Sequence, residues 1–202
     1  MTYAIQELVI RDIAPIDTDE ITGVLAAAMG DGPVARWLNP DPAVRQRYAS
    51  AYFEIFAEHA VRHGEVYASF EGPRLTGVAL WFPFTSPIPP PADYERRVKD
   101  ASGSAFDRVR ELDAALEAHH PVGPHHYLAF VAVHPDHQRR GIGSALLNRH
   151  HARLDAAGVP AYLEANDHRN RRLYLRHGYL TGTAIRLPDG PPIWPMWRPP
   201  MP

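Results

Sequence analysis

The chain has 202 residues, of which 45% are hydrophobic, and its formal net charge is −2 with histidine neutral. That length suits one domain with a sizeable core. The near-neutral charge gives no electrostatic reason to expect binding to nucleic acid or to an anionic membrane. Because cysteine is absent, disulfides, thiol nucleophiles and thiolate metal sites are excluded. The N-terminus lacks the pattern of a signal peptide, and no apolar run approaches the roughly 20 residues of a membrane span, so we expect a soluble, cytoplasmic protein.

The N-terminal stretch predicts a strand followed by a capped helix. Residues 3–11 alternate between apolar and polar enough to form the strand. Asp17 can cap the helix, with Glu20 three residues later, and Ile16 can contact Ile21 as a hydrophobic staple. We therefore expect an amphipathic helix that stops at one of the glycines near residue 30.

A second helix follows a connecting segment. Residues 31–38 suggest a loop or short turn that carries a large aromatic side chain, Trp37. Asp41-Pro42 is typical of a helix start, because proline at the first helical position loses no hydrogen bond. The helix is predicted to run to about His63 and to end at Gly64. Its aromatic-rich face is most simply explained as core.

The middle of the chain predicts a hairpin and then a break in the sheet. Residues 66–70 and 75–82 form two short strands around a tight turn. The proline-rich residues 85–91 cannot continue a ladder, because proline donates no hydrogen bond. Residues 94–118 have helical spacing in part, broken near Gly103, which predicts one or two helices.

The second half of the chain alternates strands and helices. The expected elements are a strand at 127–133, a helix at about 141–158, a strand at 160–165, a short helix at 170–176, and a terminal hairpin of 179–187 and 193–198.

The turn after the strand at 127–133 has the pattern Gln138-x-x-Gly141-x-Gly143. Glycines let the backbone approach a ligand closely, and the first amides of a helix are free to bind a phosphate. Arg139 and Arg140 add positive charge at the same point. The alternative is an ordinary loop with exposed arginines. A nucleotide-triphosphate loop and a dinucleotide fingerprint both fit poorly, because the Gly-Lys-Ser/Thr sequence and the third glycine are missing.

This turn resembles the acyl-CoA pyrophosphate loop of the GNAT acyltransferase superfamily, (Arg/Gln)-x-x-Gly-x-(Gly/Ala). Further matches follow in the expected order: Leu163-Glu164-Ala165-Asn166, Asn170, Leu173-Tyr174 and Gly178-Tyr179. Within the superfamily, the run from Gly158 to Glu164 and the Pro-Asp-Gly-Pro-Pro-x-Trp turn resemble the puromycin N-acetyltransferases and their relatives. The first hundred residues match that group only loosely, which leaves puromycin itself doubtful as the acceptor.

The resemblance implies an α/β (α+β) GNAT fold: a central mixed, mostly antiparallel sheet of about seven strands flanked by helices. It also implies a helical insertion before the fourth strand, at about residues 85–125. We expect residues 1–202 to form a single acetyltransferase domain with its donor-binding core at about 127–179. Only that core is specific to the family.

The implied activity is acetyl transfer from acetyl-CoA, as co-substrate, to the amine of a small molecule such as an amine-bearing antibiotic or metabolite. Antibiotic resistance is thus one candidate role. A protein N-acetyltransferase and a non-catalytic acyl-CoA-binding sensor remain alternatives. The protein could be a monomer or a homodimer.

The same resemblance assigns donor contacts. The backbone of Val131, Ala132 and Val133 would pair with the pantetheine arm. The loop that holds the pyrophosphate would consist of Gln138, Arg139, Arg140, Gly141, Ile142, Gly143 and Ser144. Asn170 would hydrogen-bond the donor, although asparagine is also a good helix N-cap.

Two side chains are candidates for catalysis. Tyr174 matches the family's general acid, since a phenol can protonate or hydrogen-bond a nascent thiolate at neutral pH; the simpler alternative is a core tyrosine. Glu164 is the best carboxylate for a base or substrate anchor, unless it only orients loops. His125 and His126 are further candidates for the base.

Two further predictions concern the walls of the acceptor pocket and the role of the histidines. Candidates for the walls are Trp37, Tyr52, Phe53, Trp81 and Tyr94. The chain has 12 histidines, and His59 and His63 have the i,i+4 spacing of helical ligands, but Glu58 precedes the pair rather than lying between its members. We expect structural or surface histidines and no metal site.

Overall fold

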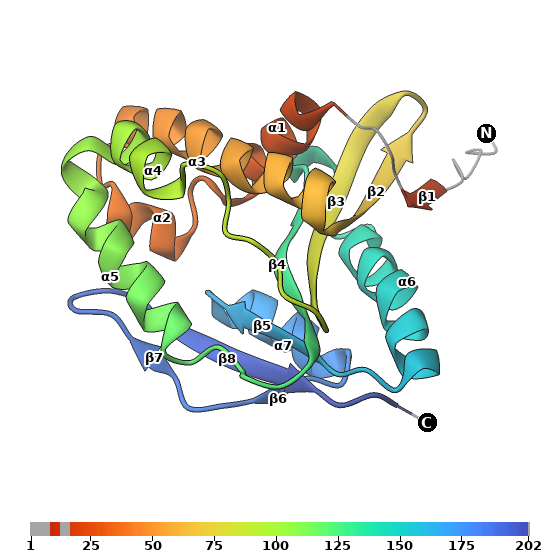
Figure 1. Cartoon of the computed structure of the whole chain (residues 1–202). Coiled ribbons are helices and arrows are strands. Elements are labelled where there is room, and N and C mark those ends of the chain that lie inside the picture. The colour runs from red at the N-terminus through yellow and green to blue at the C-terminus, as the bar shows by residue number, and fades with distance from the viewer. Residues whose placement is uncertain (1–8, 13–16, 202) are drawn as a thin grey trace.

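An eight-stranded mixed sheet, flanked by helices on both faces, organises the part of the chain that the computed structural model describes, residues 9–12 and 17–201 (Figure 1). Its strand order is β1-β2-β3-β4-β5-β8-β6, with the short β7 also paired to β8. Only β4 and β5 run parallel; the other pairings are antiparallel. This is the predicted α/β class, with the helical insertion before the fourth strand.

The described elements, in chain order, are β1 (Val9–Asp12), α1 (Thr18–Met29), α2 (Pro33–Leu38), α3 (Pro42–His63), β2 (Glu65–Glu71), β3 (Arg74–Phe84), α4 (Tyr94–Ser102), η1 (Gly103–Ala105), α5 (Phe106–Glu117), β4 (His125–Val133), η2 (Pro135–His137), α6 (Ile142–Ala157), β5 (Ala161–Ala165), α7 (His168–Arg176), β6 (Leu180–Thr181), β7 (Ile185–Arg186) and β8 (Pro192–Arg198).

The N-terminal predictions are confirmed in part. Asp17 caps α1 by accepting a hydrogen bond from the Asp19 amide at 2.9 Å. The predicted strand residues 3–8 and the staple residue Ile16 lie outside the described residues. The loop or short turn predicted at 31–38 is wrong for residues 33–38, which form α2. Pro33 stands at its first turn, where a missing amide hydrogen costs nothing.

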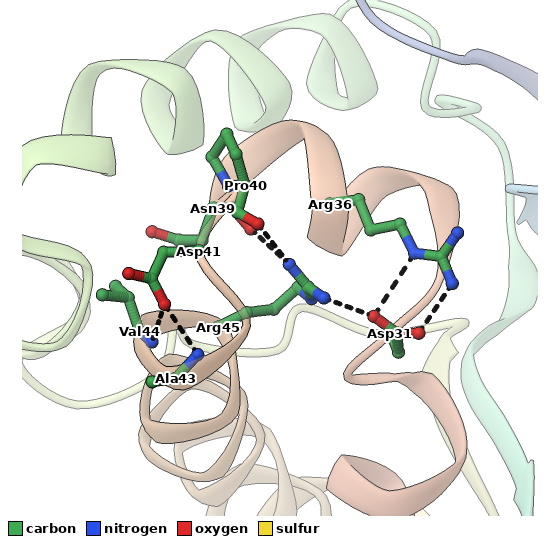
Figure 2. A network of polar contacts seen from close by, with 8 residues as sticks. All are labelled: Asp31, Arg36, Asn39, Pro40, Asp41, Ala43, Val44 and Arg45. Atoms are coloured by element: carbon green, nitrogen blue, oxygen red, sulfur yellow. Dashed lines mark hydrogen bonds and ion pairs between the residues drawn. The ribbon is translucent and has the colours of Figure 1, made fainter.

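A buried arginine fixes the connection between α1, α2 and α3 (Figure 2). Arg45 is 8% exposed and donates to the carbonyls of Asn39 and Pro40 at 2.8 and 2.9 Å. It also forms an ion pair with Asp31 at 2.5 Å, and Arg36 binds the same carboxylate at 2.6 Å. The two arginines lower the pKa of Asp31 to about 2. The network therefore sets how the chain turns between the three helices.

The two faces of the sheet carry separate cores. Strand residues alternate between the faces, and on β3 Ala79 and Trp81 join the cluster with α6, while Val78 and Leu80 join the cluster with α1 and α3. Most of β3 is therefore buried on both faces.

The segment before β4 has a core of its own. The break predicted near Gly103 is present, between α4 and α5. Val98, Val109 and Leu112 pack with Ile55 of α3 and Ile193 of β8. These two helices are therefore an integral wall of the molecule and lie at the left of Figure 1.

The terminal hairpin differs from its prediction. The continuous strand expected at 179–187 is interrupted, leaving only β6 and β7 in the ladder with β8. The Gly182 amide donates to the carbonyl of Pro195 at 2.8 Å. The ring nitrogen of Pro195 lies on the same edge of β8 and has no hydrogen to return, so the ladder breaks there.

Candidate functional site

The parallel strands β4 and β5 separate shortly after they meet. They pair only at His126 with Ala161 and at Tyr127 with Tyr162. The β3–β4 register then shifts: Trp81 lies opposite Leu128 and Leu80 opposite Phe130. The residue between is a bulge, which bends a strand. The edge of β4 that would face β5 is consequently unpaired, among the described residues, from the bulge to Val133.

Helix α6 begins at the mouth of this split. Gly141 precedes it with φ +84°, a left-handed conformation that favours glycine. The first hydrogen bond into the helix runs from the Ala145 amide to the Gly141 carbonyl. The amides of Ile142, Gly143 and Ser144 therefore have no partner within the helix and lie at the positive end of its dipole.

Side chains of the loop before α6 have different surroundings. The amide group of Gln138 donates to the Val133 carbonyl at 3.1 Å, which ties the loop to the end of β4. Arg139 lines the adjacent cavity. Arg140 does not, and instead lies 3.5 Å from Glu71 in an ion pair. Sequence reasoning treated the two arginines alike, but only Arg139 has access to the cavity.

One cavity of about 870 Å³ runs from the start of α6, through the split between β4 and β5, to helices α3, α4 and α5. It brings together all but one of the residues assigned to the site from sequence: Val131, Ala132, Val133, Gln138, Arg139, Gly141, Ile142, Gly143, Ser144, Glu164, Asn170 and Tyr174. The exception is Arg140.

Tyr174 is the buried phenol of this cavity. It lies on α7, is 7% exposed, and packs edge-to-face against Tyr179 at 5.8 Å between ring centroids. Its hydroxyl makes no hydrogen bond to any described residue. Burial raises the pKa of Tyr174, so the group stays protonated at neutral pH. It can therefore donate a proton or a hydrogen bond to a ligand.

Glu164 is the buried carboxylate of the split. It alternates with Leu163 and Ala165, which face the α6 side, and so projects toward the cavity. Burial raises the pKa of Glu164 to about 7, although Tyr127 and Tyr162 offset part of that increase. Its Oε1 atom is buried and has no hydrogen-bond partner among the described residues. A buried acceptor without a partner is costly, which suggests a ligand group here.

Asn170 is not the N-cap of α7, so that alternative is wrong. Asp167 is the cap, and it accepts from the Asn170 backbone amide at 2.7 Å. The side-chain amide of Asn170 lines the cavity, with only a long contact of 3.5 Å to Asn166. It therefore keeps hydrogen-bonding capacity for a ligand.

Three of the five aromatic candidates reach the cavity. Tyr52, Phe53 and Tyr94 line it. Trp81 does not, because it is fully buried on the other face of the sheet. Trp37 does not either, since its Nε1 donates to a carbonyl of the β7–β8 turn at 3.0 Å.

Further lining residues were missed from the sequence. Tyr48 and Phe56 complete the aromatic wall on α3, and Asp113 and Glu117 add carboxylates from α5. The aromatic face of the second predicted helix was a usable signal for the first pair. Nothing local distinguishes Asp113 from any other acidic residue beside an apolar helical stripe.

The buried histidines pair with one another and with aromatic groups. His150 is fully buried, stacks on Trp81 at 4.0 Å and contacts His126 at 3.1 Å. Burial lowers the pKa of both His126 and His150. Neither of the candidate bases His125 and His126 lines the cavity.

The described part of the chain shows neither a metal-binding cluster nor a membrane-spanning helix. No group of three or more His, Cys, Asp or Glu side chains there is arranged to hold a metal ion. Within the same residues, every helix is too short or too polar to cross a lipid bilayer.

Known proteins with this arrangement identify the family. The family model described as "Acetyltransferase (GNAT) domain" matches residues 107–180. A crystal structure of "histone acetyltransferase HPA2 and related acetyltransferase" from Corynebacterium glutamicum is 30% identical, with a TM-score of 0.74. The match covers 96% of this chain and 98% of that one. The chain belongs to the GNAT acetyltransferase superfamily.

More distant GNAT structures share the fold. Arylalkylamine N-acetyltransferase 2 from Aedes aegypti has a TM-score of 0.67 at 12% identity, over 96% of this chain and 98% of that one. A polyamine N-acetyltransferase of Drosophila melanogaster, which forms N-acetylagmatine, has a TM-score of 0.62 at 16% identity, over 95% and 98%. The protein is thus an acetyltransferase of class EC 2.3.1, and its family implies acetyl-CoA as co-substrate.

Proposed function

We propose that this GNAT acetyltransferase transfers an acetyl group from acetyl-CoA to the amine of a small molecule, within a single domain of residues 1–202. The observation that carries the proposal is the single cavity, which joins free helix amides to a buried carboxylate and an aromatic wall. The cavity has a donor half at the start of α6 and an acceptor half beside α3, α4 and α5. The two halves join at the split between β4 and β5, where both substrates would meet.

The donor half is made chiefly of backbone. The amides of Ile142, Gly143 and Ser144 would hold the pyrophosphate at the helix N-terminus. The unpaired edge of β4, at residues 131–133, would hydrogen-bond the pantetheine arm as a further strand would. Asn170 has a side-chain amide free for the same ligand. These residues fit the donor because they offer hydrogen-bonding groups along one side of the cavity.

Tyr174 is the residue we assign to the departing sulfur. Bound acetyl-CoA supplies the acetyl group as a thioester, whose sulfur leaves as a thiolate. Tyr174 remains protonated because burial raises its pKa, so its hydroxyl can donate to the negative charge that develops. Donation would matter most in the transition state, where that charge appears.

Glu164 is the residue we assign to the amine. With a pKa of about 7, its carboxylate is substantially ionised at neutral pH and can hold an ammonium or accept its proton. An α-amino group has a pKa near ~7.7–8.0 and needs little help, whereas an alkyl amine near ~10.4 needs more. The orphaned Oε1 offers the acceptor atom for either role.

A small acceptor is favoured over a protein. Helices α4 and α5 contribute Tyr94, Leu112 and Leu116 to the lining and so wall the acceptor half. A polypeptide would need an open groove there. An amine-bearing antibiotic or metabolite is compatible with this half. The intact Tyr174 and Asn170 argue against a non-catalytic acyl-CoA sensor.

The test is a thiol-release assay with acetyl-CoA over a panel of small amines and N-terminal peptides. We expect release that depends on small amines and exceeds hydrolysis. Peptide-dependent release alone would instead favour a protein N-acetyltransferase. Tight acetyl-CoA binding without amine-dependent release would favour a sensor, and either result would contradict the proposal.

A further inference from the structure

A second carboxylate faces the acceptor half, apart from Glu164. Asp113 lies on α5, is partly buried, and accepts a hydrogen bond from the Tyr94 hydroxyl at 2.9 Å. No arginine, lysine or histidine of the described residues forms an ion pair with it. A partly buried carboxylate whose only polar partner is a phenol is poorly compensated, which favours a cationic ligand.

Aromatic rings surround this carboxylate. On α3, Tyr52 lies 5.3 Å from Tyr48 and 5.0 Å from Phe56, and Phe56 lies 5.9 Å from Tyr94 of α4, all measured between ring centroids. All four rings line the cavity. Ring faces attract cations, and the attraction grows when the site is shielded from water. Rings beside a carboxylate make a site suited to an organic ammonium group.

An independent observation points to a ligand at the same place. Tyr48 is 4% exposed, and its hydroxyl is buried without a hydrogen-bond partner among the described residues. Tyr48 and Asp113 line the same cavity. An ammonium group could donate to both oxygens at once and satisfy the orphaned phenol.

Aromatic rings connect this site to the strand at the reacting end. Phe130 of β4 lies 5.2 Å from Phe56, and Phe56 lies 5.9 Å from Tyr94, whose hydroxyl donates to Asp113. The cavity therefore has Glu164 at the split, and Asp113 together with Glu117 on α5 at its far aromatic end. A ligand that spans both would have two positive groups joined by an apolar chain.

We propose that the acceptor of this enzyme is a diamine or related dication, whose distal ammonium binds Asp113, the Tyr48 hydroxyl and the surrounding rings. The inference rests on the proposed function, because Glu164 is taken to receive the reacting amine. It goes beyond that function by naming the acceptor's second charge as the feature that is recognised.

The test compares α,ω-diamines of four to eight carbons with the monoamine of the same chain length. Two measurements are made in parallel: calorimetric affinity in the presence of CoA, and kcat/KM by thiol release. We expect wild-type protein to favour the best diamine by about 10–100-fold, the range of a charge-assisted hydrogen bond. Equal affinity and equal kcat/KM for the two members of each pair would overturn the inference.

Three variants test which side chains cause the preference for diamines over monoamines. Asp113→Asn keeps the acceptor for the Tyr94 hydroxyl and removes the charge, so it should abolish the diamine preference and leave the monoamine within about threefold. Tyr48→Phe removes only the orphaned hydroxyl and should reduce the preference several-fold. Glu111→Gln, an exposed residue of the same helix outside the cavity lining, makes the same charge change and should have no effect.

The outcomes separate the two proposals. A diamine preference in binding without turnover of any amine would support the distal site and contradict the acetyl-transfer function. Turnover with no diamine preference would do the opposite. If Asp113→Asn lowers the affinities of both members of a pair equally, the carboxylate shapes the cavity without recognising a second charge, and the inference is wrong.

Discussion

The two halves of the cavity are built from different parts of the chain and by different means. The donor half uses backbone: the start of α6 after Gly141 and the unpaired edge of β4. The acceptor half uses side chains, delivered by α3 and by the α4–α5 segment. Backbone geometry constrains sequence through a few glycines, whereas a side-chain pocket can be lined in many ways. We infer that the donor half carries the family's common function and that the acceptor half carries the specificity of this chain.

The largest expected effect comes from Tyr174, the side chain that we assign to the departing sulfur. Tyr174→Phe removes only a hydroxyl that binds no described residue, so stability and acetyl-CoA affinity should hardly change. Turnover should fall by about 10²–10⁴-fold if the hydroxyl donates to the leaving sulfur. The loss should appear in kcat and in kcat/KM, and should shrink with a donor whose thiol is more acidic. Lower thermal stability with near-normal turnover would reduce Tyr174 to a packing role.

Gly143 tests whether the donor half is made of backbone. A Cβ there would meet the side chains of Val133 and Leu173 only at 3.8 and 4.0 Å, so the position tolerates a side chain. Gly143→Asp places a negative charge beside the expected pyrophosphate, and at ~4 Å the repulsion is about 4 kcal/mol, roughly 10³-fold in affinity. Gly143→Ala is the matched control and should stay within a few-fold. Calorimetry with acetyl-CoA measures both, and an unchanged affinity in folded Gly143→Asp would remove the phosphate-loop assignment.

Glu164 lies where the two halves meet, and its effect should depend on pH. The pKa of this carboxyl is raised to about 7, and the ionised form is the one that can bind or deprotonate an amine. Activity should therefore rise with pH through about 7. Glu164→Gln should lower kcat/KM by roughly 10²-fold and remove that limb of the profile. The acceptor amine used in this assay should have a pKa above ~9, so that its own titration does not coincide with that of Glu164. A limb that persists in the variant would belong to another group.

The smallest expected effect concerns the scaffold of the acceptor half. Arg45→Ala leaves the carbonyls of Asn39 and Pro40 without their donor in a buried site and should cost about 1–3 kcal/mol in the free energy of unfolding. Arg36→Ala breaks an exposed ion pair with the same Asp31 and should cost at most about 1 kcal/mol. Chemical denaturation compares the two. Equal costs would mean that the buried network does not hold the helices in place.

Much of the fold could be predicted from local chemistry. The Asp41 cap with Pro42 and the stop at Gly64 bounded α3 correctly, because caps and breakers act within one turn. The interruption between β6 and β7 could not be foreseen. It depends on Pro195 of a neighbouring strand, which is distant in the sequence.

The site was predictable in the same uneven way. The Gln138 to Gly143 pattern located the start of α6, because a left-handed residue before a helix favours glycine. Trp37 and Trp81 were candidates for the walls but do not line the cavity, because tertiary packing decides where an aromatic side chain is buried. Asp113 was missed for the converse reason: only the fold brings α5 against α3.

Residue-resolved hydrogen exchange with and without acetyl-CoA tests the central claim most directly, because it observes the backbone groups themselves. The account predicts that acetyl-CoA slows exchange at the amides of Ile142, Gly143 and Ser144 and along residues 131–133, while α4 and α5 change little. Protection confined to α4 and α5, with residues 142–144 unaffected, would contradict a donor half built from backbone.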